Sequence, residues 1–166
     1  FPRIAQNWLR AKKYESAVEY FEQTINLAPF YIPAYKWMAF AYKQLEDYDQ
    51  AIEVYKKLQH LMPRPEGKIE VLILLGETYK LAGNLEEAYQ SFLQVVGLDP
   101  QRWQIRKSIG ILAFYLGRYP EVVQHLSEYA KHDAEDLDVL QHLGVAYADL
   151  GEAEEAIVIF EKLRQE

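Results

Sequence analysis

The sequence predicts an all-α protein, a solenoid of about five helix-turn-helix repeats. The main observation is a repeat of 34 residues, visible in two sets of glycines: Gly76, Gly110 and Gly144, then Gly83, Gly117 and Gly151. A second observation is that a proline stands two residues after a leucine in three places: Leu27-Ala28-Pro29, Leu61-Met62-Pro63 and Leu98-Asp99-Pro100. With only 8 glycines and 7 prolines in 166 residues, the chain suits long helices joined by short connectors.

Each period is interpreted as two helices. In the third period, apolar residues at helical spacing predict a first helix over 70–81 and a second over 86–96. Glycines such as Gly83 suit the left-handed position after a helix, and prolines such as Pro100 stop the second helix. Pro120 fits the first turn of its helix, where no backbone N–H is needed. Small residues should let neighbouring helices approach (Ala5, Ala39, Gly76, Gly110 and Gly144), and aromatic rings should fill the space between pairs (Phe21, Tyr55, Phe92 and Phe160).

The period is interrupted once. Ala17 and Ala51 are 34 residues apart, but Ala51 and Ala88 are separated by 37, so three residues are inserted. We place the insertion in residues 64–68, because their Pro65 and Gly67 predict a connector, where extra residues cost least.

These repeats resemble tetratricopeptide repeats over essentially the whole chain. The family pattern is a large residue, Leu, a small residue and an aromatic, followed by Ala, an aromatic and Pro. The third repeat matches it with Leu72, Leu75, Gly76, Tyr79, Ala88, Phe92 and Pro100, and the second with Tyr35, Met38, Ala39, Tyr42, Ala51, Tyr55 and Pro63. The first offers Phe1, Ile4, Ala5, Trp8, Ala17, Phe21 and Pro29, and the last Leu140, Leu143, Gly144, Tyr147, Ala156 and Phe160. The resemblance implies a right-handed superhelical solenoid, one array over 1–166 with repeats at about 1–32, 33–66, 69–102, 103–136 and 137–166.

The fourth repeat departs most from this pattern. In its first helix, Arg106 stands where the pattern has a large apolar residue, and Ala113 stands where it has an aromatic residue. In its second half, Val122 replaces the small Ala, Leu126 replaces the second aromatic residue, and Ala134 replaces the Pro. The departures fit either drift in a tolerant scaffold or a locally reshaped groove.

The end of the chain lacks a polar capping helix. Residues 154–166 still carry Ile157, Phe160 and Leu163, whereas solenoids need a terminal element with a polar outer face. We therefore expect a fragment of a longer protein, or a chain that covers its end by self-association.

Composition narrows the classes of partner. Lys and Arg number 18 against 25 Asp and Glu, a net charge of −7, which argues against nucleic acid and anionic membranes as partners. The absence of cysteine excludes thiol catalysis, disulfides and thiolate metal sites. No apolar run approaches the length of a membrane span and no signal peptide is seen, which favours a soluble, cytoplasmic protein.

Signals for catalysis are weak. We expect His60, His125, His132 and His142 to be surface residues, since none pairs at the spacing of a helical zinc site. The acidic run 133–138 lacks the Gly and Glu of a calcium loop and suits a helix N-terminus. A glycine-rich phosphate loop and a Ser-His-Asp signature are also missing. The sequence therefore predicts no enzyme activity, no metal and no cofactor.

The resemblance implies that the first helix of each repeat lines a concave, peptide-binding groove. The candidate groove residues are Lys36, Phe40, Lys43, Ile73, Glu77, Lys80, Lys107, Ile111, Phe114, Gln141 and Val145. We expect Phe40, Ile73, Ile111 and Phe114 to be exposed, and Trp37, Leu74, Leu81 and Tyr115 to pack between helices. The lysines could pair with acidic residues of a partner. The Lys and Asn clamp that some family members use for chaperone C-termini is absent, so that ligand is disfavoured.

Three classes of function follow. The leading one is a protein-interaction module that binds a peptide or helical segment, as adaptor or assembly scaffold. The others are a regulatory or substrate-recruiting segment of a larger enzyme, and a structural array that self-associates through uncapped ends.

Overall fold

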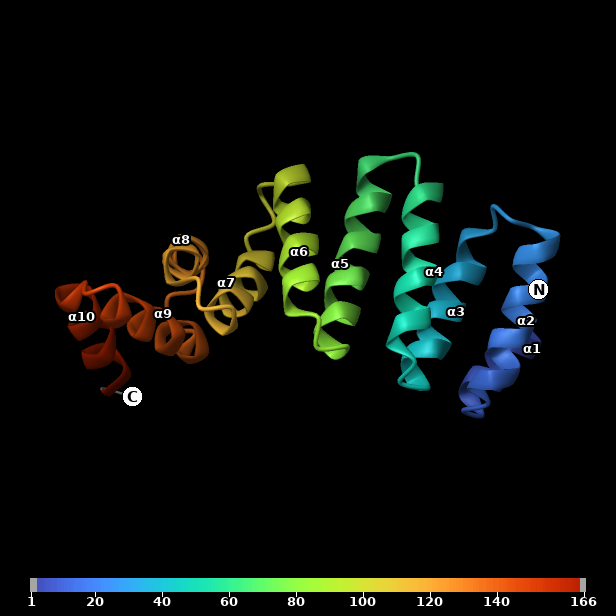
Figure 1. The fold of residues 1–166 in the computed structure, drawn as a ribbon, viewed down its shortest axis with the longest axis horizontal. Helices are drawn as coiled ribbons and strands as arrows, with labels where there is room; N and C mark the ends of the chain where they lie inside the picture. The colour runs from blue at the N-terminus through green and yellow to red at the C-terminus, as the bar shows by residue number, and fades with distance from the viewer. Residues whose placement is uncertain (1–2, 165–166) are drawn as a thin grey trace. The chain divides into compact units, whose positions relative to one another are not determined.

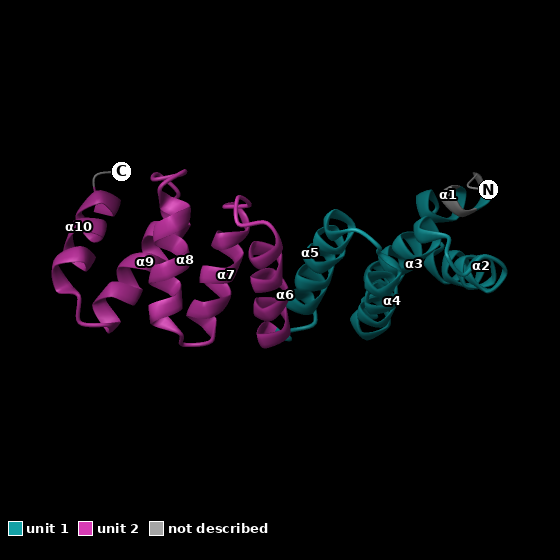
Figure 2. Cartoon of the chain, turned by 90° about the horizontal axis from the view of Figure 1, so that it is seen from above, with its two compact units in different colours: residues 1–84 teal, residues 85–166 magenta. Residues whose placement is uncertain are grey.

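Helices account for most of residues 3–164, the part of the chain that the computed structural model describes (Figure 1). The chain divides into two compact units, Phe1–Asn84 and Leu85–Glu166 (Figure 2). The helices of the first unit are α1 (Arg3–Arg10), α2 (Tyr14–Leu27), α3 (Ile32–Gln44), α4 (Tyr48–Leu61) and α5 (Pro65–Leu81). Those of the second are α6 (Leu85–Leu98), α7 (Ile105–Tyr115), α8 (Tyr119–Ala130), α9 (Leu137–Asp149) and α10 (Ala153–Arg164). Within each unit consecutive helices pack on one another, which confirms the all-α repeat prediction.

The helix ends follow the predicted signals. Gly83, Gly117 and Gly151 have φ values of 80°, 71° and 78°, the left-handed conformation expected after a first helix. Lys12 and Glu46 hold the equivalent places after α1 and α3, with φ of 57° and 60°. The second helices α2, α4 and α6 each end two residues before a proline, and Pro120 lies in the first turn of α8, as predicted.

The predicted connector at residues 64–68 is wrong. Pro65 is the first residue of α5, so the inserted residues lengthen that helix to 17 residues, against 13 in α3. A proline in the first turn removes only an N–H that has no helical partner, which is why it starts the helix rather than breaking it. A Cβ at position 67 would lie 2.7 Å from the Sδ of Met62, so Gly67 leaves room for the Met62 side chain.

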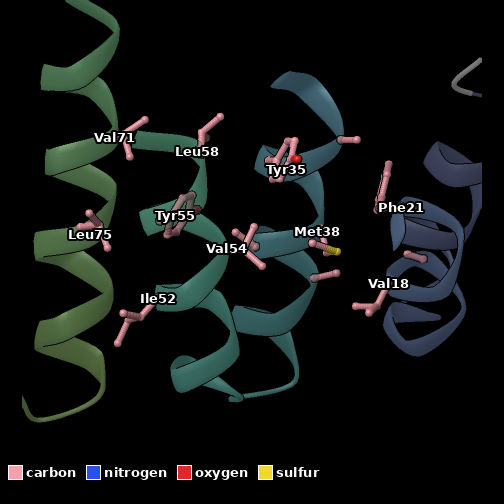
Figure 3. Close-up of a cluster of buried hydrophobic side chains, with 14 of the residues drawn as sticks. Val18, Phe21, Tyr35, Met38, Ile52, Val54, Tyr55, Leu58, Val71 and Leu75 are labelled. Carbon is pink, nitrogen blue, oxygen red and sulfur yellow. The ribbon is translucent and has the colours of Figure 1, made fainter. Parts of the chain in front are cut away.

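The core of the first unit is a continuous layer of side chains from α2 to α5 (Figure 3). Phe21 and Tyr55, the rings predicted to lie between repeats, are almost fully buried, and Leu58 and Val71 lie in the same cluster. The small residue Ala39 is fully buried, as expected at a close approach of helices. Two predicted pattern positions cannot be assessed, because Phe1 and the side chain of Ala5 lie outside the described parts of the structure.

In the second unit, the side chains of α7 and α8 that depart from the pattern in the fourth repeat are buried or hydrogen-bonded. Val122 and Leu126 are fully buried, and Leu126 occupies the space that the missing side chain of Gly110 leaves open. Arg106 on α7 donates a hydrogen bond to Nδ1 of His125 on α8 at 3.3 Å. His125 is buried, so the prediction of a surface histidine is wrong at this position. The ring keeps a polar partner because α7 supplies a guanidinium where other repeats have an apolar residue.

The last helix, α10, leaves part of its apolar surface uncovered. Ile157, Val158 and Phe160 are exposed, while Leu163 is half-buried. Phe160 contacts Gly144 with one edge of its ring, so it only partly fills the place predicted for it.

Candidate functional site

Each of the two units presents a candidate surface of its own on its first helices. In the first unit the exposed side of α3 carries Trp37 and Phe40, because Met38, Ala39 and Ala41 point into the core. Residues three apart are neighbours on a helix, and the two rings contact edge to face with centroids 6.1 Å apart. Trp37 is 43% exposed and Phe40 38% exposed, so both rings remain available.

Trp37 and Phe40 form one wall of a pocket of about 340 Å³. Leu9 and Arg10, at the end of α1, line the opposite side. We call these four residues the α1/α3 pocket. The hollow is small and mainly apolar, and Arg10 is the one charged residue in its lining.

The lysines of the first unit are less available than predicted. Lys36 on α3 forms an ion pair with Glu70 on α5, with 2.6 Å between Nζ and Oε1. Lys80 lies 3.4 Å from Glu77 on the same helix. Both pairs are partly exposed and so contribute little stability, but they neutralise charges expected to meet a partner. Lys43 forms no ion pair within residues 3–164, so no described side chain neutralises its charge.

The predicted exposures on α3, α5 and α7 are partly reversed. Trp37, Leu81 and Tyr115 were expected to pack between helices but are exposed; of that group only Leu74 packs against the core. Phe40 is exposed as expected, whereas Ile73, Ile111 and Phe114 are half-buried. Which side of an apolar helix faces a neighbour depends on side chains of the neighbouring helix, which the repeat pattern does not show.

The second unit presents an aromatic cluster that we define as Phe114, Tyr115 and His142. The ring of Phe114 on α7 meets His142 on α9 edge to face, at a centroid distance of 4.7 Å. The ring centroids of Tyr115 and Phe114 are 5.9 Å apart. Tyr115 is 65% exposed, so it is the accessible part of the cluster. Gln141 and Val145, also predicted for this surface, are exposed on α9.

One nitrogen of His142 is fixed by its own helix. Its Nδ1 lies 2.7 Å from the backbone oxygen of Asp138. Because a carbonyl oxygen only accepts, Nδ1 carries a hydrogen and donates it; Oδ1 of the Asp138 carboxylate lies 3.3 Å from the same nitrogen. The cluster therefore combines apolar ring surface with a polar ring.

Lys107 belongs to a structural network rather than to a free binding surface. Its Nζ lies 2.7 Å from Asp136 and 3.4 Å from Asp138. Asp136 also accepts hydrogen bonds from the Val139 N–H, as the N-cap of α9, and from the Tyr129 hydroxyl. Burial alone would raise the pKa of Asp136, but these hydrogen bonds outweigh it and lower the pKa; the bond to Asp136 raises the pKa of Lys107. The acidic run thus caps a helix, as predicted.

Sequence reasoning missed three contributors to the α1/α3 pocket. Leu9 and Arg10 belong to the first repeat, whose groove positions were not assigned, and Trp37 was expected to pack between helices. The spacing of Trp37 three residues before Phe40 was the signal available. No three potential metal ligands come together among the residues whose positions are described. None of the described helices has the length and apolar character needed to cross a bilayer.

Comparisons with protein families and curated proteins point the same way as the fold. Models of the tetratricopeptide repeat match residues 9–68, 69–102 and 107–166. The chain is 28% identical over 121 residues to the BBSome complex member BBS4 of Bos taurus, covering 72% of this chain and 23% of that protein. It is 23% identical over 174 residues to anaphase-promoting complex subunit 6 of Arabidopsis thaliana, covering 98% and 32%. The chain thus spans about a quarter to a third of the length of these relatives.

Solved structures share the arrangement of the helices. The crystal structure of MamA matches with a TM-score of 0.80 at 16% identity, over 99% of this chain and 95% of that one. YrrB, described as a tetratricopeptide repeat protein with an unusual peptide-binding site, matches with a TM-score of 0.76 at 19% identity, over 96% and 80%. At these identities the likeness establishes the fold alone.

Proposed function

The chain belongs to the tetratricopeptide repeat family, and from that premise we propose that it is a non-catalytic protein-interaction module. It binds a peptide or helical segment of a protein partner on the exposed side of its first helices, as adaptor or assembly scaffold. The observation that carries this proposal is the α1/α3 pocket, where two large aromatic rings stay accessible beside Arg10. Trp and Arg are among the residue types enriched in the binding hot spots of protein interfaces, which cluster near the interface centre.

The aromatic cluster of the second unit supports the same function. Tyr115 offers a large apolar surface with a hydroxyl group, and the ring of His142 lies beside it, with 6.3 Å between the ring centroids. Two separate anchor sites, one in each unit, suit a partner segment with at least two apolar anchors. The curated relatives are members of multiprotein complexes by name, which favours an assembly role.

Ion pairing decides which charges would contribute to binding. An acidic partner residue must displace Glu70 from Lys36, or Asp136 from Lys107. Replacing one ion pair by another adds little binding free energy. Arg10 and Lys43 have no such competitor in the described structure, so they should set the orientation and association rate of an acidic segment.

The test begins with identification of proteins that co-purify with the chain, followed by affinity measurement with one purified partner. The double variant Trp37→Ala/Phe40→Ala should weaken binding by about 2 kcal/mol or more, roughly thirtyfold. Phe30→Ala is the matched control, because Phe30 is an 81% exposed aromatic residue in the α2–α3 connection, away from the pocket. Tyr115→Ala tests the second anchor in the same way.

Changing Lys43→Ala should weaken binding less than the aromatic variants, and the loss should shrink as salt is added. Melting curves and helicity of all variants should match the parent chain, since the altered side chains are exposed or half-buried. Binding that is unchanged in Trp37→Ala/Phe40→Ala and in Tyr115→Ala would remove the first-helix surfaces from consideration.

A further inference from the structure

Charge is distributed unequally between the two ends of the sequence. Residues 3–14 contain Arg3, Arg10, Lys12 and Lys13 and no acidic residue, whereas residues 149–161 contain Asp149, Glu152, Glu154, Glu155 and Glu161 and no basic one. None of Arg10, Lys12 and Lys13 forms an ion pair within residues 3–164, and the same holds for Glu154, Glu155 and Glu161. Each of these two stretches therefore carries charges of one sign, and the residues just named form no ion pair with a described side chain; Lys162 and Arg164 follow the acidic stretch in the last turn of α10.

The acidic end carries an apolar stripe. One face of α10 is formed by four residues that follow one another at intervals of three, one and three positions: Glu154, Ile157, Val158 and Glu161. Ile157 and Val158 are 56% and 65% exposed. The face presents two aliphatic side chains with a carboxylate about one turn before them and another about one turn after. An open hollow of about 380 Å³ beside it is lined by Tyr147, Glu154 and Glu155 together with Val158 and Ile159.

The basic end carries the complementary surface. The α1/α3 pocket is apolar along Leu9, Trp37 and Phe40 and has Arg10 at its rim. Lys43 follows Phe40 by three residues on α3, so a second cation lies one turn along the same side. Lys12 and Lys13 follow Arg10 in the turn after α1. An apolar centre between two cations matches an aliphatic pair between two carboxylates.

We propose that the acidic face of α10 of one copy docks in the α1/α3 pocket of a second copy of this chain. Ile157 and Val158 fill the pocket against Trp37 and Phe40, and Glu154 and Glu161 pair with Arg10 and Lys43. The Lys12 and Lys13 side chains then approach the hollow that Glu154 and Glu155 line. The contact joins two different surfaces, so each copy can use both, and assembly continues into rings or open chains.

This inference rests on the pocket of the proposed function, and a self-docked α10 would compete with a partner segment for it. The two claims separate experimentally, because partner binding is measured with a purified partner and self-association with the chain alone. A chain that stays monomeric but binds its partner through Trp37 and Phe40 overturns self-docking and leaves the proposed function in place.

Sedimentation velocity over a range of protein concentrations provides the first test. The parent chain should form dimers and larger species at low salt, and their dissociation constant should rise as salt is added. The pocket variant Arg10→Glu/Lys43→Glu should associate at least tenfold more weakly, and so should the helix variant Glu154→Lys/Glu161→Lys, since each places like charges opposite one another. A matched control is Lys56→Glu/Lys57→Glu, which reverses two exposed charges on α4 and should associate as the parent does.

Recombining the reversed charges makes the test specific. A mixture of the pocket variant with the helix variant should associate again, because every contact between unlike chains then pairs opposite charges. A single chain that carries all four reversals should likewise regain self-association. Failure of both restorations, or undiminished association of either variant alone, overturns the proposal.

Cross-linking gives the contact directly, because the chain has no cysteine of its own. Ala11→Cys lies directly after Arg10 at the end of α1, and Ala153→Cys directly before Glu154 on α10, the residue that the docking pairs with Arg10; both positions are exposed. Under mild oxidation, a mixture of these two variants should form mixed disulfide dimers several times faster than Ala153→Cys mixed with Gln124→Cys, an exposed control on α8. Equal rates in the two mixtures would contradict the proposed docking.

Discussion

The Cδ2 atom of Leu126 lies 2.3 Å from the position that a Cβ on Gly110 would take, and its Cγ lies 2.4 Å away. Helices α7 and α8 approach one another through this contact, and Leu126 is fully buried there, so it has no room to withdraw. The Leu126 side chain therefore fits against the helix at position 110 only because Gly110 has no side chain.

This relationship predicts strong coupling between the two residues. Gly110→Ala should destabilise the chain by about 1–3 kcal/mol through overpacking, although alanine is the better helix former. In a double-mutant cycle of thermal or denaturant unfolding, Leu126→Ala should cost less in the Gly110→Ala background than in the parent, by at least about 0.5 kcal/mol. Simple additivity of the two changes would contradict the contact.

The left-handed residues after the first helices predict an asymmetry between repeats. Glu46 adopts φ of 60° without being glycine, whereas Gly117 adopts 71° at the equivalent place. Glu46→Gly should raise the free energy of unfolding by about 0.5–1 kcal/mol, because relief of strain exceeds the added chain entropy. Gly117→Ala should lower it by about 1 kcal/mol. Glu46→Ala is the control: it removes the same side chain atoms beyond Cβ and should bring no gain.

The buried His125 predicts that acid destabilises the second unit. Burial, followed by the charge of Arg106, lowers the pKa of His125 against a smaller opposing effect of Glu121. The unfolded chain therefore takes up a proton near pH 6.5 while the folded chain does not, so stability falls as pH drops through this value. The free energy of unfolding stops falling once the pH is below the pKa of His125 in the folded chain. His125→Gln, which can still accept from Arg106, should flatten this part of the curve relative to the parent in denaturant titrations between pH 7.5 and 5; parallel curves would contradict the assignment.

Asp136 should be worth more than an ordinary helix cap. It caps α9, accepts from Tyr129 and pairs with Lys107, whereas Asp47 caps α4 through the Gln50 N–H alone. Asp136→Ala should therefore cost about 2 kcal/mol of unfolding free energy, against about 1 kcal/mol for Asp47→Ala. Because the folded pKa is lowered, this contribution is present at neutral pH and is lost as pH falls through the folded pKa. Equal losses of unfolding free energy in the two variants would show that Asp136 stabilises the fold only as a helix cap.

The repeated elements of the fold were predictable because their causes are local. Glycines with positive φ after first helices, prolines after second helices and buried rings such as Phe21 and Tyr55 each follow from properties of one residue and its helix. The same signals recur every 34 residues, which made the repeat recognisable. The matching family models confirm the family resemblance. The extra turn of α5 escaped prediction because Pro65 and Gly67 suit both a connector and a first helical turn.

The sequence by itself determined the class of fold, the helix pairs and most of the core. The tertiary structure alone decided which side chains remain available on the first helices. Lys36 and Lys107 are engaged by Glu70 and Asp136, residues 34 and 29 positions away. His125 is buried against Arg106 from the preceding helix. Such outcomes depend on the distance and angle between helices, which arise from packing across the repeats and not from the pattern within one of them.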